Sequence, residues 1–291
     1  MTVRAPGKVN VCLFVGEPRE SDGRHELVSV MQAVDLADDL RLGPADGDAD
    51  EVRCPGVEGP NIVADAIAAF RARTGWDGPP VAVTVTKRIP VAAGMAGGSA
   101  DAAATLRLLA GVAGVDDMAL LRDVAAGLGA DVPAQVLPGR YLATGAGERV
   151  EALAPVWPSP SVLILPSADA LSTPAVYAEF DRLGLPRAPE DLADRLRAVR
   201  AATSGRRSGL PAELVVNDLA PAARSLLPSL DEPLAHVRDA GADHALVAGS
   251  GPTVLGLFAD AARARTAAQA LRRHHPRLVL TMPVVAAAGA R

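Results

Sequence analysis

A glycine-rich segment in the first half of the chain has the composition of a phosphate-binding loop. Residues 87–104 read KRIPVAAGMAGGSADAAA, in which Gly94, Gly97 and Gly98 stand among other small residues. With few side chains in the way, a ligand can approach this backbone closely. A helix beginning at about Ser99 would turn its free N–H groups and the positive end of its dipole toward an anion. The segment therefore predicts phosphate binding rather than a connection that uses glycine only for its geometry.

Two common nucleotide-binding patterns do not match this segment. No Lys-Ser/Thr pair follows the glycines, as a Walker A loop requires. GxGxxG with a ribose-binding acid about 20 residues further on is also missing, which argues against a Rossmann-type dehydrogenase. Asp101 lies just inside the expected helix, where its charge would repel a nearby phosphate. We expect its carboxylate to point away from the ligand or to act through a cation.

The overall composition excludes several other classes of protein. The 291 residues include 29 Lys and Arg against 34 Asp and Glu, a net charge of −5, and only 3% aromatic residues. Such a chain lacks the basic field and the stacking surfaces of nucleic-acid binding. Two cysteines, Cys12 and Cys54, make neither a disulfide framework nor a zinc knuckle. No apolar run reaches the roughly 20 residues of a membrane span, so we expect a cytoplasmic protein that binds neither nucleic acid nor membranes.

Irregularly alternating strand and helix patterns predict an α+β protein of two domains. The stretch 154–161, APVWPSPS, is the best linker candidate and places the domains at 1–155 and 156–291. Strands are expected at 9–15, 27–34, 81–86, 162–165, 244–248, 254–258 and 278–282. Helices are expected at 62–70, 99–110, 117–128, 190–200 and 260–273.

The glycine loop and two other segments resemble three motifs of the GHMP small-molecule kinases. Pro90-x-x-x-Gly94-Met-x-Gly97-Gly98-Ser99-Ala100 is similar to the central motif; APGKVN at 5–10 and VAGSGPT at 247–253 are similar to the first and third, in the family's order. The resemblance implies an N-terminal ribosomal-protein-like nucleotide-binding domain and a C-terminal ferredoxin-like α/β domain. It also implies ATP as co-substrate, with Mg²⁺ carried on the phosphates rather than in a protein cage.

Three more segments narrow this resemblance to one branch of the family. DGRHEL at 22–27, LGADVP at 128–133 and STPAVY at 172–177 are similar to the branch that phosphorylates the 2-hydroxyl of a cytidine-diphosphate-linked methylerythritol, in the non-mevalonate isoprenoid pathway. Homoserine- or mevalonate-type kinases are the alternatives with the same fold. The alternative from another class is a non-catalytic nucleotide-binding regulator, against which the retention of Lys8 and Asp131 argues.

The resemblance assigns catalysis to Asp131 as general base and Lys8 as its charge partner. A carboxylate can accept the proton of the attacking hydroxyl. An ammonium can keep that carboxylate ionised and offset the developing phosphate charge. No residue is expected to be a dedicated metal ligand.

Recognition of the two ligands is assigned by the same resemblance. His25 is expected to hydrogen-bond the cytosine edge and Tyr177 to stack on the ring. A helix cap is an equally good interpretation of Asn61. The expected ATP-binding residues are Asn61, Lys87, Pro90, Val91, Ala92, Ala93, Gly94, Met95, Ala96, Gly97, Gly98, Ser99 and Ala100. The expected substrate-binding residues are Asn10, Arg24, His25, Thr173, Tyr177, Gly249 and Ser250.

Two departures from the family pattern concern affinity rather than chemistry. Arg24 stands where the family has Tyr or Phe stacking on cytosine; its planar guanidinium could stack there or pair with the diphosphate. Ala92, Ala93 and Ala96 replace frequent glycines and, because alanine requires an ordinary φ, predict a modestly lower nucleotide affinity. We expect a monomer or a weak homodimer.

Overall fold

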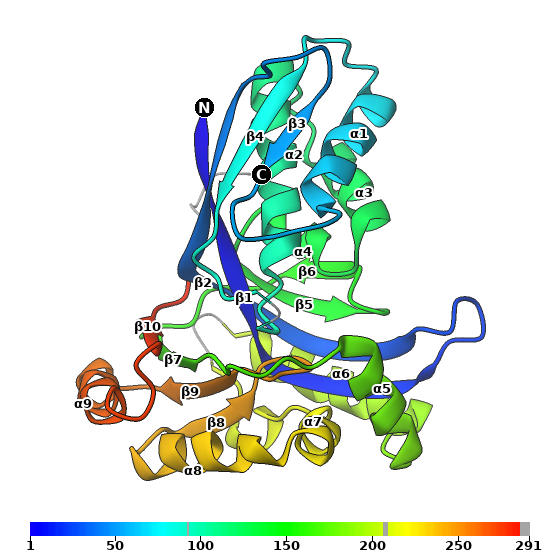
Figure 1. Cartoon of the computed structure of the whole chain (residues 1–291). Helices are drawn as coiled ribbons and strands as arrows, with labels where there is room; N and C mark the ends of the chain where they lie inside the picture. The colour runs from blue at the N-terminus through cyan, green and yellow to red at the C-terminus, as the bar shows by residue number, and fades with distance from the viewer. Residues whose placement is uncertain (92, 206–208, 286–291) are drawn as a thin grey trace. The chain divides into compact units, whose positions relative to one another are not determined.

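The chain forms two compact units built from interleaved segments (Figure 1). The computed structural model describes residues 1–91, 93–205 and 209–285. The first unit comprises residues 1–7, 36–91 and 96–138, and the second comprises 8–35, 92–95 and 139–291. Two long strands, β1 (Thr2–Pro18) and β2 (His25–Pro44), contribute to both units. The predicted boundary at residue 155 is a different division of the chain and stays a prediction.

In the first unit, helices cover one face of its part of a six-stranded sheet (Figure 1). This part consists of β3 (Glu51–Arg53), β4 (Val81–Thr86), the last part of β2 and the start of β1, and β1 pairs with β2. Strand β4 pairs in parallel with β3 and antiparallel with the last part of β2, with Asp39 opposite Thr86. Because side chains alternate along a strand, the valines of VAVTVT share the buried face. The helices of this unit are α1 (Ile62–Thr74), α2 (Gly97–Ala113), α3 (Met118–Leu128) and α4 (Val132–Gln135).

Polar caps and glycines set the ends of these helices. The Asn61 side chain accepts a hydrogen bond from the N–H of Val63 at 3.0 Å and begins α1. Asp117 caps α3 in the same way through the N–H of Leu120 at 2.9 Å. Gly114 ends α2 with a left-handed φ of 70°. The predicted cap at Asn61 is confirmed.

In the second unit, the first part of β2 continues into another antiparallel layer. It pairs with β5 (Arg140–Thr144), which pairs in turn with β6 (Arg149–Ala152). Helix α6 (Pro189–Thr203) covers this layer and places Val199 in a core with Phe14 and Val28.

A separate four-stranded antiparallel sheet completes the second unit. Its order is β10 (Val279–Thr281), β7 (Ser161–Leu165), β9 (Val254–Phe258) and β8 (His244–Val247). Helix α8 (Asp231–Asp239) packs on β8 and β9, and α9 (Ala261–Leu271) packs on β7 and β10, while α5 (Thr173–Arg182) contacts α7 (Ala220–Leu226). Short 3₁₀ turns lie at Ala212–Leu214 and Pro228–Leu230.

Most predicted elements are confirmed, but the extent of the first two strands was underestimated. Strands β1 and β2 run for 17 and 20 residues, through Pro, Gly, Lys and Asn positions that ordinarily indicate a strand end. The patterns also missed β3, β5, β6, α4, α5, α7 and α8. Most of these are short, and α5 and α7 have a proline in their first turn. Within the described ranges, no helix combines the length and apolarity needed to cross a bilayer.

Candidate active site

Two carboxylates share one lysine ammonium beneath the start of α2 in the first unit. Lys87 follows β4 and reaches Asp38 of β2, with Nζ 2.5 Å from Oδ2, and Asp101 of α2, with Nζ 2.7 Å from Oδ2. The other oxygen of Asp38 accepts hydrogen bonds from the N–H groups of Arg88 at 2.5 Å and Ile89 at 2.8 Å. This cluster therefore ties β2, the turn after β4 and the first turns of α2 together.

The charges of this cluster do not balance. Asp38 is 0% and Asp101 is 4% exposed, and one ammonium faces both carboxylates. Burial raises the pKa of Asp101 to about 7, although Lys87 works in the opposite direction. Burial would lower the pKa of Lys87, but the hydrogen bonds and charges of Asp101 and Asp38 raise it above its usual value. The expectation that the Asp101 carboxylate acts through a cation agrees with its bond to Lys87.

The glycine loop enters α2 with an unusual backbone at Ala96. Ala96 has a φ of 53°, the only left-handed non-glycine residue in the described part of the chain, and it makes no side-chain cap. The expectation that alanine here keeps an ordinary φ is therefore wrong, because the tight entry into the helix imposes this conformation. The helix starts at Gly97, two residues before the predicted start at Ser99. Ala92 lies outside the described residues.

The second and third motifs meet through backbone contacts within the second unit. Gly94 has a φ of 69°, and a Cβ there would lie 2.2 Å from the carbonyl oxygen of Ala248. A Cβ on Gly249 would lie 3.3 Å from the carbonyl oxygen of Gly94 and 3.6 Å from Oδ1 of Asn10. Glycine is thus required at position 94 both by its conformation and by the close approach of the neighbouring turn.

The first motif joins the same region through a chain of hydrogen bonds. The backbone N–H of Lys8 donates to the carbonyl of Met95 at 3.0 Å. Its ammonium donates to Oδ1 of Asn10 at 2.8 Å, and Asn10 Nδ2 donates to the Ser29 hydroxyl at 2.7 Å. Ser29 donates in turn to the carbonyl of Cys12 at 2.6 Å. All three sequence motifs therefore converge, and Lys8 is held in a buried, oriented position.

Asn217 holds the third-motif turn from the opposite side. It forms a parallel bridge with Leu13 of β1. Its Nδ2 donates to the carbonyls of Val247 and Gly249, both at 2.7 Å, and its Oδ1 accepts from the N–H of Leu219 at 3.0 Å. The Asn217 amide thus fixes both ends of the segment 247–249, which leads into the third-motif turn.

Two predicted substrate-binding residues contact one another at this turn. The hydroxyls of Thr173, at the start of α5, and the buried Ser250 lie 2.8 Å apart. Helix α5 is therefore joined to the third motif at its first residue.

A buried histidine and two aromatic rings form a second part of the site. The carbonyl of Gly16 lies 2.8 Å from Nδ1 of His25, and because a carbonyl only accepts, this nitrogen carries a hydrogen. Nε2 of His25 lies 3.4 Å from a carboxylate oxygen of Asp181. The His25 ring is 5.1 Å from that of Tyr177 and 6.1 Å from that of Phe180, measured between centroids. Helix α5 supplies all three partners other than Gly16, so α5 sets the surroundings of this imidazole.

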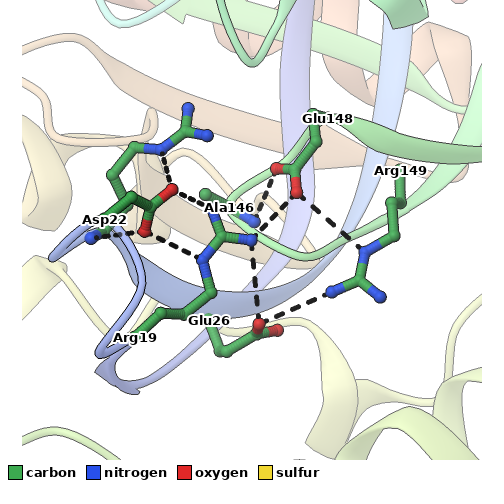
Figure 2. A network of polar contacts seen from close by, with 7 residues as sticks. Arg19, Asp22, Glu26, Ala146, Glu148 and Arg149 are labelled. Carbon is green, nitrogen blue, oxygen red and sulfur yellow. Dashed lines mark hydrogen bonds and ion pairs between the residues drawn. The ribbon is translucent and has the colours of Figure 1, made fainter. Parts of the chain in front are cut away.

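Arg19 anchors the turn between β1 and β2, next to His25 in the chain. Figure 2 shows it between three carboxylates. It binds Asp22 through two nitrogens at 3.1 and 2.5 Å, Glu148 at 2.9 Å and Glu26 at 3.8 Å. Arg149 also contacts Glu26, at 3.5 Å. The network ties this turn to the connection between β5 and β6.

Arg24, the residue that replaces the family's aromatic ring, is held by the same carboxylate. Its Nε donates to Asp22 at 2.9 Å, and its backbone N–H donates to the other oxygen at 3.1 Å. Its side chain is 51% exposed. Arg19 and Arg24 together hold the pKa of Asp22 below its usual value. Because Arg19 binds Asp22 through two nitrogens, that carboxylate would keep a cationic partner if Arg24 turned to a ligand.

The expected general base lies in the first unit. Asp131 immediately precedes the short helix α4, is half-buried and makes no side-chain cap to that helix. Lys8 belongs to the second unit, so the joint catalytic role of the two residues is a proposal.

Sequence reasoning missed four residues that hold these groups in place. Asp38, Ser29, Asn217 and Phe180 are buried and contact predicted site residues. Polar residues inside a strand pattern were a usable signal for Ser29 and Asp38. Phe180 and Asn217 stand in segments whose local pattern carries no such signal.

The described residues offer Mg²⁺ no set of three or more His, Cys, Asp or Glu side chains arranged as metal ligands.

Comparison with known proteins places the chain among kinases of small molecules. The GHMP kinases N terminal domain matches residues 61–139, and the GHMP kinases C terminal domain matches residues 190–277. A 4-diphosphocytidyl-2-C-methyl-D-erythritol kinase of Streptomyces coelicolor is 43% identical over 100% of this chain and 98% of its own length. A crystal structure of 4-(cytidine 5'-diphospho)-2C-methyl-D-erythritol kinase has a TM-score of 0.77 at 32% identity, covering 97% of this chain and 99% of that one. A homoserine kinase from Cytophaga hutchinsonii shares the fold, with a TM-score of 0.75 at 19% identity over 99% of this chain and 96% of that one.

The chain belongs to the GHMP kinase family and is an ATP-dependent small-molecule kinase. Within that family, its full-length relatives are 4-diphosphocytidyl-2-C-methyl-D-erythritol kinases. The predicted α+β GHMP kinase fold, the kinase class and ATP as co-substrate are confirmed.

Proposed function

We propose that this kinase phosphorylates the 2-hydroxyl of 4-diphosphocytidyl-2-C-methyl-D-erythritol, in the non-mevalonate isoprenoid pathway. The observation that carries the proposal is the His25 imidazole, oriented by Gly16 and flanked by Tyr177. A base-recognising ring has no use in a kinase for homoserine or mevalonate, because neither molecule carries a nucleobase. The names of the full-length relatives support the same choice.

Cytosine recognition is assigned to His25 and Tyr177. With Nδ1 donating to Gly16, Nε2 is the ring nitrogen left to form a hydrogen bond with the cytosine edge. Tyr177 offers an aromatic face for stacking. Asn10, Thr173, Gly249 and Ser250 are proposed to line the methylerythritol side. Lys8 holds Asn10, the hydroxyls of Thr173 and Ser250 hold each other, and Asn217 holds Gly249.

Arg24 is proposed to contact the substrate in place of the family's aromatic ring, by stacking on cytosine or by pairing with the diphosphate. Its exposure and its shared carboxylate support both contacts. We expect Arg24→Tyr to keep or improve the KM for the cytidyl substrate. A large rise in KM would assign Arg24 to the diphosphate, and Arg24→Lys would then recover part of the affinity through charge alone.

For catalysis we propose Asp131 as the base that accepts the hydroxyl proton and Lys8 as the cation that offsets the transferred phosphate's charge. The hydrogen bond from Lys8 to Asn10 gives that ammonium a defined position before substrate arrives. Asp131→Asn should keep the fold and ADP affinity and lower kcat by about 10²–10⁴-fold. An unchanged kcat would contradict the assigned role.

Residues 90–100 are proposed to bind the ATP phosphates, with Asn61 and Lys87 near the adenine. Mg²⁺ is proposed to enter on those phosphates, where it would neutralise part of their charge. The free backbone N–H groups at the start of α2 supply donors for the same purpose. A cytoplasmic location and a monomeric or weakly dimeric state remain predictions.

The test is ADP release by the purified protein with Mg-ATP and each acceptor in turn. We expect turnover with 4-diphosphocytidyl-2-C-methyl-D-erythritol and only background with homoserine, mevalonate or no acceptor. Turnover with homoserine or mevalonate alone would replace the proposed substrate. ATP binding without turnover on any acceptor would favour the regulatory alternative, and Asp131→Asn provides the matched inactive control.

A further inference from the structure

The cluster at the start of α2 contains two carboxyl groups and one ammonium, so it has one more negative charge than positive charge when both carboxyl groups are ionised. Asp38 and Asp101 flank Lys87, and both carboxylates are buried. A buried charge without a partner is costly, so such a site favours a proton or a compensating ligand.

The hydrogen bonds indicate where that proton would bind. Both oxygens of Asp38 already accept hydrogen bonds, from Lys87 on one side and from the N–H groups of Arg88 and Ile89 on the other. In Asp101, Oδ2 accepts from Lys87, whereas Oδ1 is buried and finds no hydrogen-bond partner among the described residues. A proton on Asp38 would displace a donor, but a proton on Asp101 Oδ1 displaces nothing.

Cys54 also faces this cluster and carries no competing charge near neutrality. Cys54, in the loop after β3, interacts electrostatically with Lys87, Asp101 and Asp38. Burial raises the pKa of the Cys54 thiol, which keeps it neutral, and the neighbouring Asn61 has no charge. Asp101 is therefore the group of this cluster that titrates near neutral pH, with a pKa raised by burial to about 7.

The cluster also lies directly against the start of α2. A Cβ on Gly97 would lie 3.3 Å from Nζ of Lys87, and the glycine leaves that space open. A phosphate bound at this end of the helix would bring negative charge toward Asp101 and would displace water. Both effects favour the neutral form of a carboxyl group.

We propose that Asp101 is a positioning residue of the nucleotide-binding loop, acting through Lys87, and that it takes up one proton from solvent when nucleotide binds. The proposal rests on phosphate binding by residues 90–100. The proton adds to Asp101 Oδ1 and changes the cluster from one net negative charge to neutrality, while Lys87 stays protonated between the two side chains. Nucleotide affinity accordingly falls as pH rises through the range in which Asp101 ionises.

Calorimetric titration of the whole protein with MgADP tests this inference without any acceptor. Titrations at about pH 8 in two buffers of different ionisation enthalpy report the number of protons taken up. We expect wild type to take up a fraction of a proton, up to one, per ADP. We also expect its Kd to rise by up to about tenfold per pH unit above neutrality.

Two variants and one control assign the proton to the cluster. Asp101→Asn should lose this uptake and show a Kd with little dependence on pH. Asp38→Asn balances the ionised cluster and should have the same effect, which keeps the test decisive if one variant fails to fold. Asp116→Asn changes an exposed acid outside the cluster and should behave as wild type.

Three outcomes would contradict the inference. ADP binding by wild type without proton uptake, or with the same uptake in Asp101→Asn, would overturn it and leave the proposed function intact. Failure of wild type to bind ADP would instead overturn the proposed nucleotide site, and the inference with it.

Discussion

The two units hold their candidate site residues by different physical means. In the first unit, the buried Asp38 and Asp101 and the partly buried Lys87 are charged groups that hold one another. In the second, Asn10, Ser29, Thr173, Ser250 and Asn217 are joined by hydrogen bonds, most between uncharged groups, and glycines allow backbones to meet. Removing one member of a buried ion cluster leaves an unpaired charge, whereas removing a neutral partner leaves an unpaired dipole. The first unit should therefore be the more sensitive to single substitutions and to pH.

The largest effect is expected at Lys87. Lys87→Met leaves two buried carboxylates without their shared cation, and we expect a loss of about 3–5 kcal/mol in the free energy of unfolding at about pH 8. Arg88→Met is the matched control, because Arg88 pairs with Asp39 through a side chain that is 63% exposed. The control should cost about 0–1 kcal/mol. If urea unfolding gave the two variants equal losses in the free energy of unfolding, the result would contradict the view that buried charges hold the first unit together.

Gly94 is the most sensitive position expected in the second unit. Gly94→Ala would place a methyl 2.2 Å from the carbonyl oxygen of Ala248, at a φ of 69°. We expect a loss of about 3 kcal/mol or more, from clash and backbone strain together. Gly184→Ala has a similar φ of 66° with nothing within 4 Å, and should cost about 1 kcal/mol. Thermal unfolding of the two variants separates the effect of the clash from that of the backbone strain. Similar losses of stability in both variants would show that the close contact between Gly94 and Ala248 contributes nothing.

The pH dependence of stability should follow Asp101. Because its folded pKa of about 7 lies above the usual 3.8, the folded state binds the proton more tightly than the unfolded state. The resulting stability is fully present below the unfolded pKa and is lost as pH rises toward the folded pKa. Between about pH 5.5 and 7, a full proton's difference lowers the free energy of unfolding by about 2 kcal/mol. Chemical denaturation across this pH range should show the loss in wild type and not in Asp101→Asn. If the free energy of unfolding of both proteins changed with pH in the same way, Asp101 would not be its cause.

A smaller, pH-indifferent effect is expected at Ser29. Ser29→Ala removes a buried hydroxyl that bonds Asn10 and the carbonyl of Cys12, and should cost about 1–2 kcal/mol. Because no charge is exposed or buried by this change, the loss should be the same at about pH 6.5 and about pH 8.5 in chemical denaturation. A loss that varied steeply with pH would show that charge also governs the second unit.

The smallest effect is a gain in stability at Ala96. Ala96→Gly relieves a left-handed conformation that costs an L-residue about 1 kcal/mol, partly offset by the greater freedom of glycine when unfolded. We expect a Tm a few degrees higher. Ala93→Gly, which changes a buried residue of the same loop, should not raise the Tm. A lower Tm for Ala96→Gly would show that the methyl group contributes packing that outweighs the strain.

The sequence alone was sufficient for the parts of this molecule that follow local patterns. The glycine loop, the cap at Asn61 and the strand at 81–86 each depend on residues close together in the chain. The cluster that holds Lys87 could not be predicted, because Asp38 lies 49 residues away and its polar character within a strand does not indicate which residue it pairs with. Asn217 and Phe180 could not be predicted for the same reason, because their roles depend on tertiary packing and not on a local sequence pattern. Ala96 shows a further limit, because its conformation is imposed by the fold against its residue type.

One measurement tests the contrast between the two units most directly: the equilibrium Kd of wild type for MgADP and, separately, for 4-diphosphocytidyl-2-C-methyl-D-erythritol, across about pH 7 to 8.5. We predict that ADP affinity falls steadily with rising pH, because Asp101 ionises, while affinity for the cytidyl substrate stays constant. A constant ADP affinity together with a pH-dependent affinity for the cytidyl substrate would contradict the account.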